Sequence, residues 1–226
     1  MLRATARHSW CVLVAGVLLV AASARPAHAD TIVNQPIDPN GGNAISQEFP
    51  DFPAFTSYEF DDVTTVAPYY LTNLTVYGVE TGDPTANTAV TAQIWNGLPG
   101  TGSVVLSASG SQVGGDLSFD FAAALLPAGN YWLTAFVTRP FGTGGQWYWY
   151  NSQPVNGSEA YFYNPGGGFG CGTSPIKKSD CGQFGYTSDQ AFLLEGRLAP
   201  VPEPASLTLL GMGLVGYVAR RRVRNG

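Results

Sequence analysis

The middle of this 226-residue chain contains no histidine and no methionine. Both histidines, His8 and His28, lie in the first thirty residues, and the two methionines are Met1 and Met212. Without histidine, residues 30–200 cannot form a Ser-His-Asp or Cys-His nucleophilic system or an ordinary zinc hydrolase site. The chain also has no GxxxxGK[ST] phosphate loop and no dinucleotide fingerprint at a strand–helix junction. We therefore expect no enzymatic activity, no catalytic residues and no cofactor.

Basic residues are equally scarce between Asp30 and Pro200. Four of them stand against fifteen acidic residues, which gives this stretch a net charge of −11. Such an acidic body repels polyphosphates, which argues against nucleic acid as a partner. The other seven basic residues lie before residue 30 or after residue 219, and this suggests that the two ends are targeting segments.

The N-terminal end has the pattern of a secretory signal peptide. Arg3 and Arg7 precede an apolar run over residues 10–22, and Ala27 and Ala29 then supply small residues three and one positions before a cleavage site. We expect signal peptidase to remove residues 1–29. A membrane anchor is the alternative, but the apolar run is shorter than the roughly 20 residues that span a bilayer.

The C-terminal end combines a proline motif, a short apolar segment and an arginine cluster. These are Pro202, Glu203 and Pro204, then residues 205–219 without a charge, then Arg220, Arg221 and Arg222. The prolines disfavour regular secondary structure. As a helix the apolar segment would span about 22 Å, and the arginines would remain in the cytoplasm.

Residues 201–226 resemble the PEP-CTERM sorting signal of exported proteins in Gram-negative bacteria. The resemblance implies transient insertion of a short transmembrane helix in the inner membrane and recognition by exosortase, a membrane transpeptidase-like protease. Cleavage near the Pro-Glu-Pro motif would deliver the body to the cell surface or extracellular matrix. A permanent C-terminal anchor is the alternative, and it too leaves the body outside the inner membrane.

Residues 30–200 alternate apolar and polar side chains with period two, between turns rich in Gly, Pro and Asn. This predicts an all-β fold, a single β-sandwich of jelly-roll type, flanked by an N-terminal signal helix and a C-terminal hydrophobic helix. The expected strands are 57–66, 74–77, 90–95, 103–108, 117–122, 131–138, 146–151, 159–163 and 189–197.

A series of short motifs in the body is similar to that of many PEP-CTERM surface proteins, a family body without an assigned activity. The resemblance supports the fold and the location, not a mechanism. The motifs are FDDV (60–63), LTVYG (74–78), IWNG (94–97), LPAGNYWL (126–133), WYW (147–149) and DQAFLLEG (189–196).

Cys171 and Cys181 flank a polar loop. In an exported protein a close pair of this kind is most simply a disulfide. A zinc pair is the rival, but the body has no third or fourth soft ligand. The disulfide would hold the long glycine-rich connection over residues 164–188, which has few apolar residues of its own.

Exposed aromatic rings are the candidate ligand-binding residues. Trp147 and Trp149 project from one face of a predicted strand and Tyr148 and Tyr150 from the other, while Trp95 adds further aromatic surface. One stripe must fill the core, and the other is either covered by residues 164–188 or free to stack on sugar rings.

Four acidic residues near strand ends are the remaining candidates, namely Asp61, Asp62, Asp189 and Glu195. Asp61, Asp62 and Asp189 could supply oxygen ligands to calcium, although no loop has EF-hand spacing. A carboxylate pair could in principle serve a glycosidase. Solvated or capping roles are the simpler interpretation of such residues.

We therefore expect an exported surface or matrix protein with a structural or adhesive role in the envelope or exopolysaccharide matrix. The alternative is a carbohydrate-binding module that uses exposed aromatic rings. Signal peptidase and exosortase are the partners during export, and extracellular polysaccharide is the candidate partner afterwards.

Overall fold

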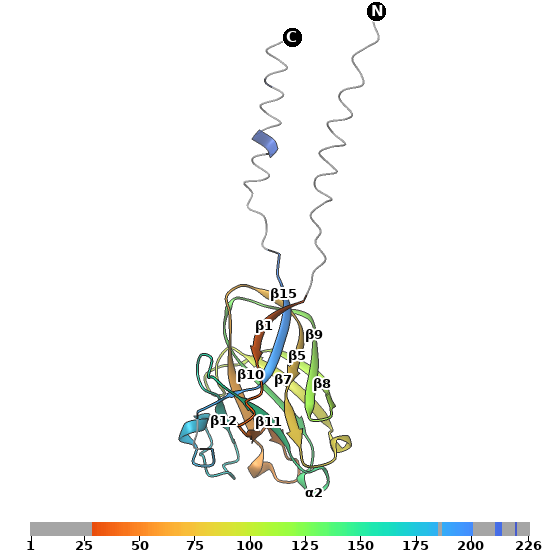
Figure 1. Ribbon diagram of the computed structural model, residues 1–226, viewed down its shortest axis with the longest axis vertical. Coiled ribbons are helices and arrows are strands. Elements are labelled where there is room, and N and C mark those ends of the chain that lie inside the picture. The colour runs from red at the N-terminus through yellow and green to blue at the C-terminus, as the bar shows by residue number, and fades with distance from the viewer. Residues whose placement is uncertain (1–28, 185–186, 201–210, 214–219, 221–226) are drawn as a thin grey trace, which may run out of the picture.

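The computed structural model describes residues 29–184, 187–200, 211–213 and Arg220. Its body is built mainly from antiparallel strands with short helical turns between them (Figure 1), and β3 alone pairs in parallel, with β10, among the strands that the structure describes. The strands are β1 (Asp30–Gln35), β2 (Asn43–Ile45), β3 (Gln47–Glu48), β4 (Tyr58–Thr65), β5 (Tyr69–Val76), β6 (Gly78–Glu80), β7 (Ala89–Trp95), β8 (Val104–Val113), β9 (Asp116–Leu126), β10 (Gly129–Thr138), β11 (Trp147–Ser152), β12 (Tyr161–Tyr163), β13 (Ile176–Lys177), β14 (Asp189–Gln190) and β15 (Phe192–Leu198). The helical turns are η2 (Pro53–Phe55), η3 (Pro84–Ala86), α2 (Phe141–Gly144) and η4 (Lys178–Asp180).

One large sheet folds back on itself to make both layers of a sandwich. Its strands follow the order β1-β15-β5-β9-β8-β7-β10-β4-β12-β13. The long strand β8 forms the corner, because residues 104–109 pair with β7 and residues 110–113 pair with β9. Gly110 lies at this change of partner, and a Cβ there would come within 2.4 Å of the Phe119 ring. The all-β prediction is confirmed.

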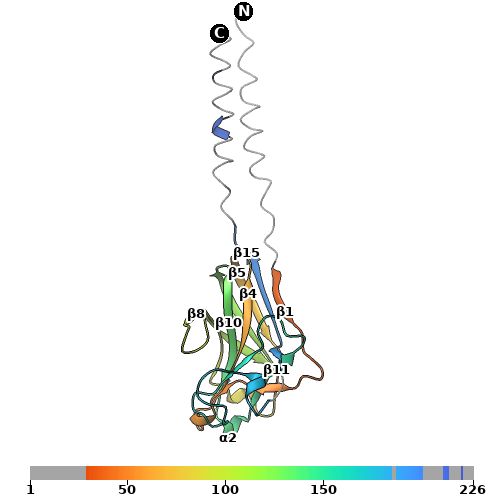
Figure 2. The ribbon, with the colours of Figure 1, turned by 90° about the vertical axis from the view of Figure 1, so that its left-hand side faces the viewer.

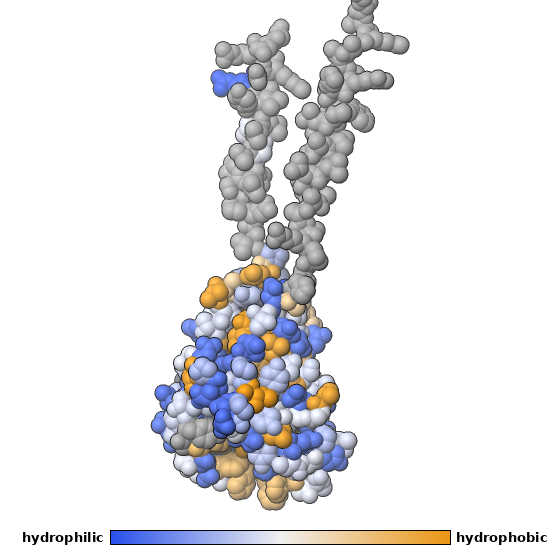
Figure 3. Space-filling view, viewed as in Figure 1, coloured by the Kyte–Doolittle hydropathy of each residue, from blue (hydrophilic) through white to orange (hydrophobic). Residues whose placement is uncertain are grey.

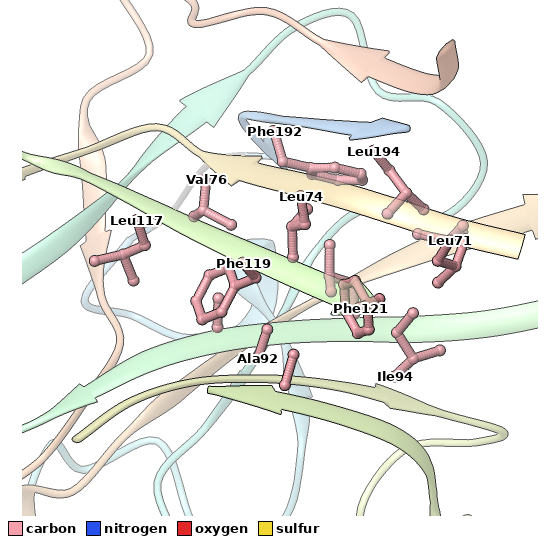
Figure 4. Packing of buried hydrophobic residues seen from close by; sticks show 14 of the residues in the cluster. Leu71, Leu74, Val76, Ala92, Ile94, Leu117, Phe119, Phe121, Phe192 and Leu194 are labelled. Carbon is pink, nitrogen blue, oxygen red and sulfur yellow. The ribbon is translucent and has the colours of Figure 1, made fainter. Parts of the chain in front are cut away.

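The sandwich core lies between β1-β15-β5-β9 on one side and β7-β10-β4 on the other. Inward side chains alternate with outward ones along each strand, as period-two patterning requires. Figure 4 shows rings and branched side chains of β5, β9 and β15 facing those of β7. The members that are at most 1% exposed are Val63, Leu71, Leu74, Val76, Ala92, Ile94, Leu117, Phe119, Leu126, Leu133, Ala135, Val137, Trp147, Trp149, Phe192 and Leu194.

A small sheet completes this core with the order β14-β11-β2, and β6 also pairs with β11. Ala191 explains why the predicted strand 189–197 is split into β14 and β15. Its N–H donates to the Tyr150 carbonyl and its carbonyl accepts from the Tyr77 N–H. The chain therefore changes partners at this residue, from β11 before it to β5 and β1 after it.

The strands that the sequence did not predict are β1, β2, β3, β6 and β13. Three of them pair with a predicted strand through only two or three residues, and β13 pairs only with β12. Such short segments carry too few alternating positions to reveal a period. β8 and β9 are also longer than predicted, and β9 continues past a bulge opposite residues 71–73 of β5.

Residues 164–184 form a loop lobe beside the sandwich. A second apolar cluster, separate from the sandwich core, lies under it: Ile45, Phe49, Phe162 and Cys181 are buried there, with Tyr148, Phe169, Cys171, Ile176 and Phe184 around them. The Cys171–Cys181 disulfide joins two points of this lobe, with their Cα atoms 5.3 Å apart. The predicted disulfide is confirmed.

The start and the end of the body lie at the same end of the molecule. Asp30 of β1 pairs with Gly196 of β15, and β15 ends at Leu198. Figures 1 and 2 both show α2 at the opposite end. We call these the tail end and the far end.

Candidate functional site

Trp147 and Trp149 on β11 are fully buried in the sandwich core, with no exposed surface. Each buried indole keeps a hydrogen-bond partner: Trp147 Nε1 donates to the Gly115 carbonyl at 2.7 Å, and Trp149 Nε1 donates to the Ala191 carbonyl at 2.8 Å. This satisfies the one polar atom of each ring. Both residues are therefore removed from the candidate ligand-binding set, because no ligand can stack on them.

Tyr148 and Tyr150 occupy the other face of β11 and are half-buried. Tyr148 packs against the second apolar cluster, which includes Cys181 of the loop lobe, and its hydroxyl donates to Gln146 Oε1 at 2.5 Å. The 164–188 connection therefore contributes to the apolar cluster beside Tyr148, and Tyr148 and Tyr150 keep part of their surface exposed.

A wider aromatic surface lies on the outer face of β7, β10, β4 and β12. Trp132 of β10 stands opposite Trp95 of β7 and opposite Asp62 of β4. Directly opposed residues of antiparallel strands share a face. Ring contacts continue across the strands, with Trp132 and Tyr161 centroids 5.1 Å apart. We call this surface the aromatic face; its members are Tyr58, Phe60, Trp95, Trp132, Phe136, Tyr161 and Tyr163.

Five rings of the aromatic face are half-exposed, and only Phe60 and Phe136 are buried. Polar groups border it, because Asp62 and Thr64 also line a polar depression of about 300 Å³ together with Asn34 and Asn156. Burial raises the pKa of Asp62, against the Ser158 N–H that donates to it. Flat rings beside hydrogen-bonding groups are what a sugar ring needs.

A different aromatic site lies at the far end. Phenylalanines from residues 49–55, α2 and the loop lobe surround a cavity of about 310 Å³, and among the residues that the structure describes Gln146 is the one polar residue that lines it. Phe52, Phe55 and Phe141 are 48%, 42% and 47% exposed, and pale apolar surface is visible at this end in Figure 3. We call it the phenylalanine pocket; its rings are Phe49, Phe52, Phe55, Phe141 and Phe169.

Hydrogen bonds from the start of α2 to Asp51 hold Phe141 in place beside the pocket. Both carboxylate oxygens of Asp51 accept backbone N–H groups at the start of α2, from Phe141 and Gly142, each at 2.9 Å. The Phe141 ring then meets Phe52 and Phe49 edge-on, with centroids 5.9 and 6.1 Å away. Our sequence reading missed this site, although phenylalanine at every third position of the proline-containing stretch 49–55 is a signal for it.

The four acidic candidates do not meet at one point. Asp61 and Asp189 are fully buried, whereas Glu195 is half-buried on β15 in the other layer, where its Oε2 accepts from Asn73 at 3.1 Å. Asp61 uses both oxygens on backbone N–H groups, of Asp62 at 2.8 Å and Gln190 at 2.6 Å. Among the residues that the structure describes, no group of three or more His, Cys, Asp or Glu could hold a metal ion.

Asp61 and Asp189 belong instead to a buried polar cluster that also contains Glu59, Asn151, Lys178 and Gln190, each less than 1% exposed. Burial raises the pKa of Glu59 to about 8, against the lowering effects of Lys178 and of the Gln190 amide. Burial raises the pKa of Asp189 to about 7. Burial and the neighbouring Asp189 charge raise the pKa of Asp61 well above its ordinary value. The cluster therefore holds protons near neutral pH.

The predicted cleavage and sorting residues lie mostly outside the described residues. Ala29 and Arg220 are among the described residues, and both are exposed. The others lie outside the described residues: Ala27, Pro202, Glu203, Pro204, Arg221 and Arg222. Residues 211–213 and Arg220 are helical. Nothing that the structure describes forms a helix long and apolar enough to cross a bilayer.

Comparison with known proteins identifies the tail and not the body. No curated protein matches the chain. Residues 200–222 match the family model described as the PEP-CTERM protein-sorting motif, and this match begins two residues after β15 ends at Leu198. The chain thus carries a PEP-CTERM sorting motif, the mark of an exported exosortase substrate that Gram-negative bacteria sort to the cell surface.

Proposed function

We propose that the protein acts without catalysis, as an adhesive and structural component of the cell envelope or exopolysaccharide matrix. The observation that carries this proposal is the separation of two features. The sorting motif follows β15 at the tail end. The phenylalanine pocket is lined in part by Phe141 of α2, and Figure 1 shows α2 at the far end. A body delivered through its tail would present this pocket outward.

The pocket suits an uncharged apolar group. Five phenylalanines line it, and Gln146 is the one polar side chain among the described residues of the lining. A hydroxyl-rich ligand would therefore lose hydrogen bonds to water there without replacing them. An apolar group instead gains roughly 25 cal/mol for each Å² removed from water. The cavity is at the small end of the range for ligand sites, which fits a ring or a short alkyl segment.

Adhesion to a defined apolar surface tests this role. Cells that express the full-length chain and export the protein are incubated with octyl-coated beads and with hydroxyl-coated beads. We expect selective retention on the octyl beads, and a severalfold loss when Phe52 and Phe141 are both changed to serine. The matched control is Val66→Ser, because Val66 is 88% exposed and precedes β5 at the tail end. Equal retention of all three strains would contradict the proposal.

A second candidate function is carbohydrate binding on the aromatic face, and one observation favours it. Trp132 lies across from Asp62, where exposed rings border the polar depression lined by Asn34, Asp62, Thr64 and Asn156. Rings bury the C–H face of a sugar while amide and carboxylate groups bind its hydroxyls.

Glycan arrays and pull-down of matrix polysaccharide test the second candidate. Binding that is lost in Trp132→Ala and Tyr161→Ala would support it, provided that the variants keep the wild-type circular dichroism spectrum. Tyr70→Ala is the control, since Tyr70 is a half-buried ring on β5 in the other layer. Absence of binding to every glycan would leave the adhesive role alone.

A further inference from the structure

Three distant segments bring a lysine, an asparagine and a glutamic acid together inside the body. Lys178 lies in η4, Asn151 in β11 and Glu59 in β4, and none of the three has exposed surface. Lys178 Nζ lies 2.5 Å from Asn151 Oδ1 and 3.9 Å from Glu59 Oε2. An amine and a side-chain amide in such close contact are reactants as well as hydrogen-bond partners.

The surrounding structure fixes each of these groups. The backbone N–H of Lys178 donates to the Ala160 carbonyl at 3.1 Å, and the Asn151 Nδ2 donates to the Gly41 carbonyl. Glu59 Oε2 accepts from Gln190 Nε2 at 2.8 Å. Little conformational freedom is left to lose before reaction, and this is the main way in which a folded site accelerates a bond-forming step.

The site also excludes water and favours uncharged forms. The Phe184 ring centroid lies 5.4 Å from Lys178 Nζ, and Phe162 pairs with Glu59 across β12 and β4. Burial lowers the pKa of Lys178, against the raising effect of Glu59 and the other nearby acids, and raises that of Glu59 to about 8. A neutral amine is the nucleophilic form of lysine, and a protonated carboxyl can donate a proton.

Glu59 Oε1 supports the protonated form. It is buried, and it has no hydrogen-bond partner among the residues that the structure describes. A carboxylate oxygen in that position would leave a charge unsatisfied, whereas a carboxylic acid places a proton there.

We propose that Lys178 and Asn151 become joined by an intramolecular amide bond between Nζ and Cγ, formed by the folded chain itself with Glu59 as the proton-transferring group. This modification site goes beyond the adhesive role and does not depend on it.

The step balances without an oxidant or an added reactant. The lone pair of the neutral Nζ attacks Cγ of Asn151, and the new Nζ–Cγ bond forms as the carbonyl electrons move to Oδ1. Glu59 gives its proton to Nδ2 and takes one from Nζ, so that it ends protonated as it began. When the carbonyl reforms, the Cγ–Nδ2 bond breaks and ammonia leaves.

The product would tie the loop lobe to the sandwich. Asn151 belongs to β11, which carries two tryptophans of the sandwich core, and Lys178 lies three residues before Cys181 of the disulfide. An amide cannot be broken by thiols, so the lobe would stay attached where a reductant opens the disulfide.

Mass spectrometry of the wild-type protein tests the proposal directly. The full-length chain is expressed in its host, and the exported protein is purified, reduced, digested and sequenced by fragmentation. We expect one branched species that contains both Asn151 and Lys178, lighter than the two separate peptides by about 17 Da, the mass of ammonia. Trypsin should cut after Lys177 and not after Lys178. Linear peptides with unmodified Asn151 and Lys178 would overturn the proposal, as would a link formed with loss of water.

Two matched variants then test the role of Glu59. Glu59→Gln removes the proton-transferring carboxyl and should abolish the link. Glu159→Gln changes the acid that pairs with the adjacent Lys177 at 3.5 Å, and should leave the link intact. If the link forms as completely in Glu59→Gln as in wild type, Glu59 is not the proton-transferring group, and that part of the proposal is wrong. If Glu59→Gln does not fold, the wild-type measurement and its peptide masses still decide whether the bond exists.

Discussion

The sandwich core and the loop lobe achieve order in different ways. The core buries the inward rows of long strands such as β5, β9 and β10, and almost every member of it is apolar. The lobe has only β13 and η4 as regular structure, and four of the described residues are buried in its apolar cluster. The Cys171–Cys181 disulfide and the buried polar cluster also hold the lobe in place. Apolar burial suffices where strands are long, and irregular chain needs specific links.

The same contrast exists between two adjacent lysines. Lys177 pairs with Glu159 at 3.5 Å near the surface, and its side chain is 48% exposed. Lys178 pairs with Glu59 inside the protein, where neither side chain is exposed. An exposed pair contributes little because water and salt screen it. A buried pair demands close partners for every polar atom, or neutralisation, because removal from water is costly.

The largest expected effect is in the sandwich core. Trp149→Ala removes a fully buried ring and its hydrogen bond to the Ala191 carbonyl, and should lower the free energy of unfolding by about 3–5 kcal/mol. Urea denaturation followed by circular dichroism measures this loss. Tyr150→Ala on the opposite face of β11 is the control and should cost much less, since Tyr150 is half-exposed. Equal losses would show that the two faces of β11 are not distinguished by burial.

A second large effect should come from pH, and it tests the polar side of the comparison. The pKa of Glu59 is raised from 4.5 to about 8 and that of Asp189 from 3.8 to about 7, in both cases mainly by burial. Between the ordinary pKa and the raised pKa of each group, the folded chain binds more protons than the unfolded chain. The free energy of unfolding therefore falls as pH rises through this range. The two shifts total on the order of 6 kcal/mol from pH 5 to pH 8, at about 1.4 kcal/mol per pKa unit. The lowered pKa of Lys178 offsets part of this loss, so we expect a net loss of a few kcal/mol.

Denaturation at several pH values checks this slope. Asp189→Asn and Glu59→Gln should each flatten part of it, because an amide does not titrate. The lowered pKa of Lys178 acts in the opposite sense wherever the folded amine is neutral. The contribution of each acid is therefore read from the difference in slope between wild type and its variant, because both proteins contain Lys178. A free energy of unfolding that rose steadily from pH 5 to pH 8 would contradict the proposed protonation of the cluster.

The sequence predicted these two regions unequally, for physical reasons. Alternation revealed the strands and the opposed stripes of β11, but a period of two cannot tell which stripe faces inward; Trp147 and Trp149 were therefore left as candidates for binding. Lys178 looked like Lys177 in the sequence, and Glu59 like any polar strand residue. Lys178 and Glu59 come together through pairing between segments far apart in the chain, such as β4 with β12. Local sequence patterns do not reveal such long-range pairing.

Removal of the disulfide should affect the loop lobe more than the core. In the chain-entropy model a loop of this size contributes up to about 2.8 kcal/mol. We expect Cys171→Ser/Cys181→Ser to increase hydrogen exchange and protease cutting within residues 164–184, while amides of β5 and β9 keep their protection. Hydrogen-exchange mass spectrometry measures both regions in one experiment. Loss of protection in β5 and β9 to the same extent would mean that the two regions unfold as one unit.

The smallest effect concerns the one strained stretch of the sandwich strands. Ala122 and Ala123 of β9 have φ values of 51° and 58°, a conformation that costs alanine roughly 1 kcal/mol and glycine almost nothing. The strain belongs to the bulge opposite residues 71–73 of β5, where the Ala122 N–H donates to Asp120 Oδ1 at 2.7 Å. Ala122→Gly should therefore raise the free energy of unfolding, by up to about 1 kcal/mol, because relief of strain outweighs the extra flexibility of the unfolded chain.

Ala124→Gly is the matched control for that change. Ala124 is the next residue in ordinary strand pairing, opposite Leu71, and it packs against the sandwich core. Glycine there gains no conformational relief and loses a packed methyl group, so the free energy of unfolding should fall by about 0.5–1 kcal/mol. Opposite signs for two alanines two positions apart would locate the strain in the bulge. A loss in both variants would instead mean that the aspartate contact at Asp120 already offsets the left-handed backbone.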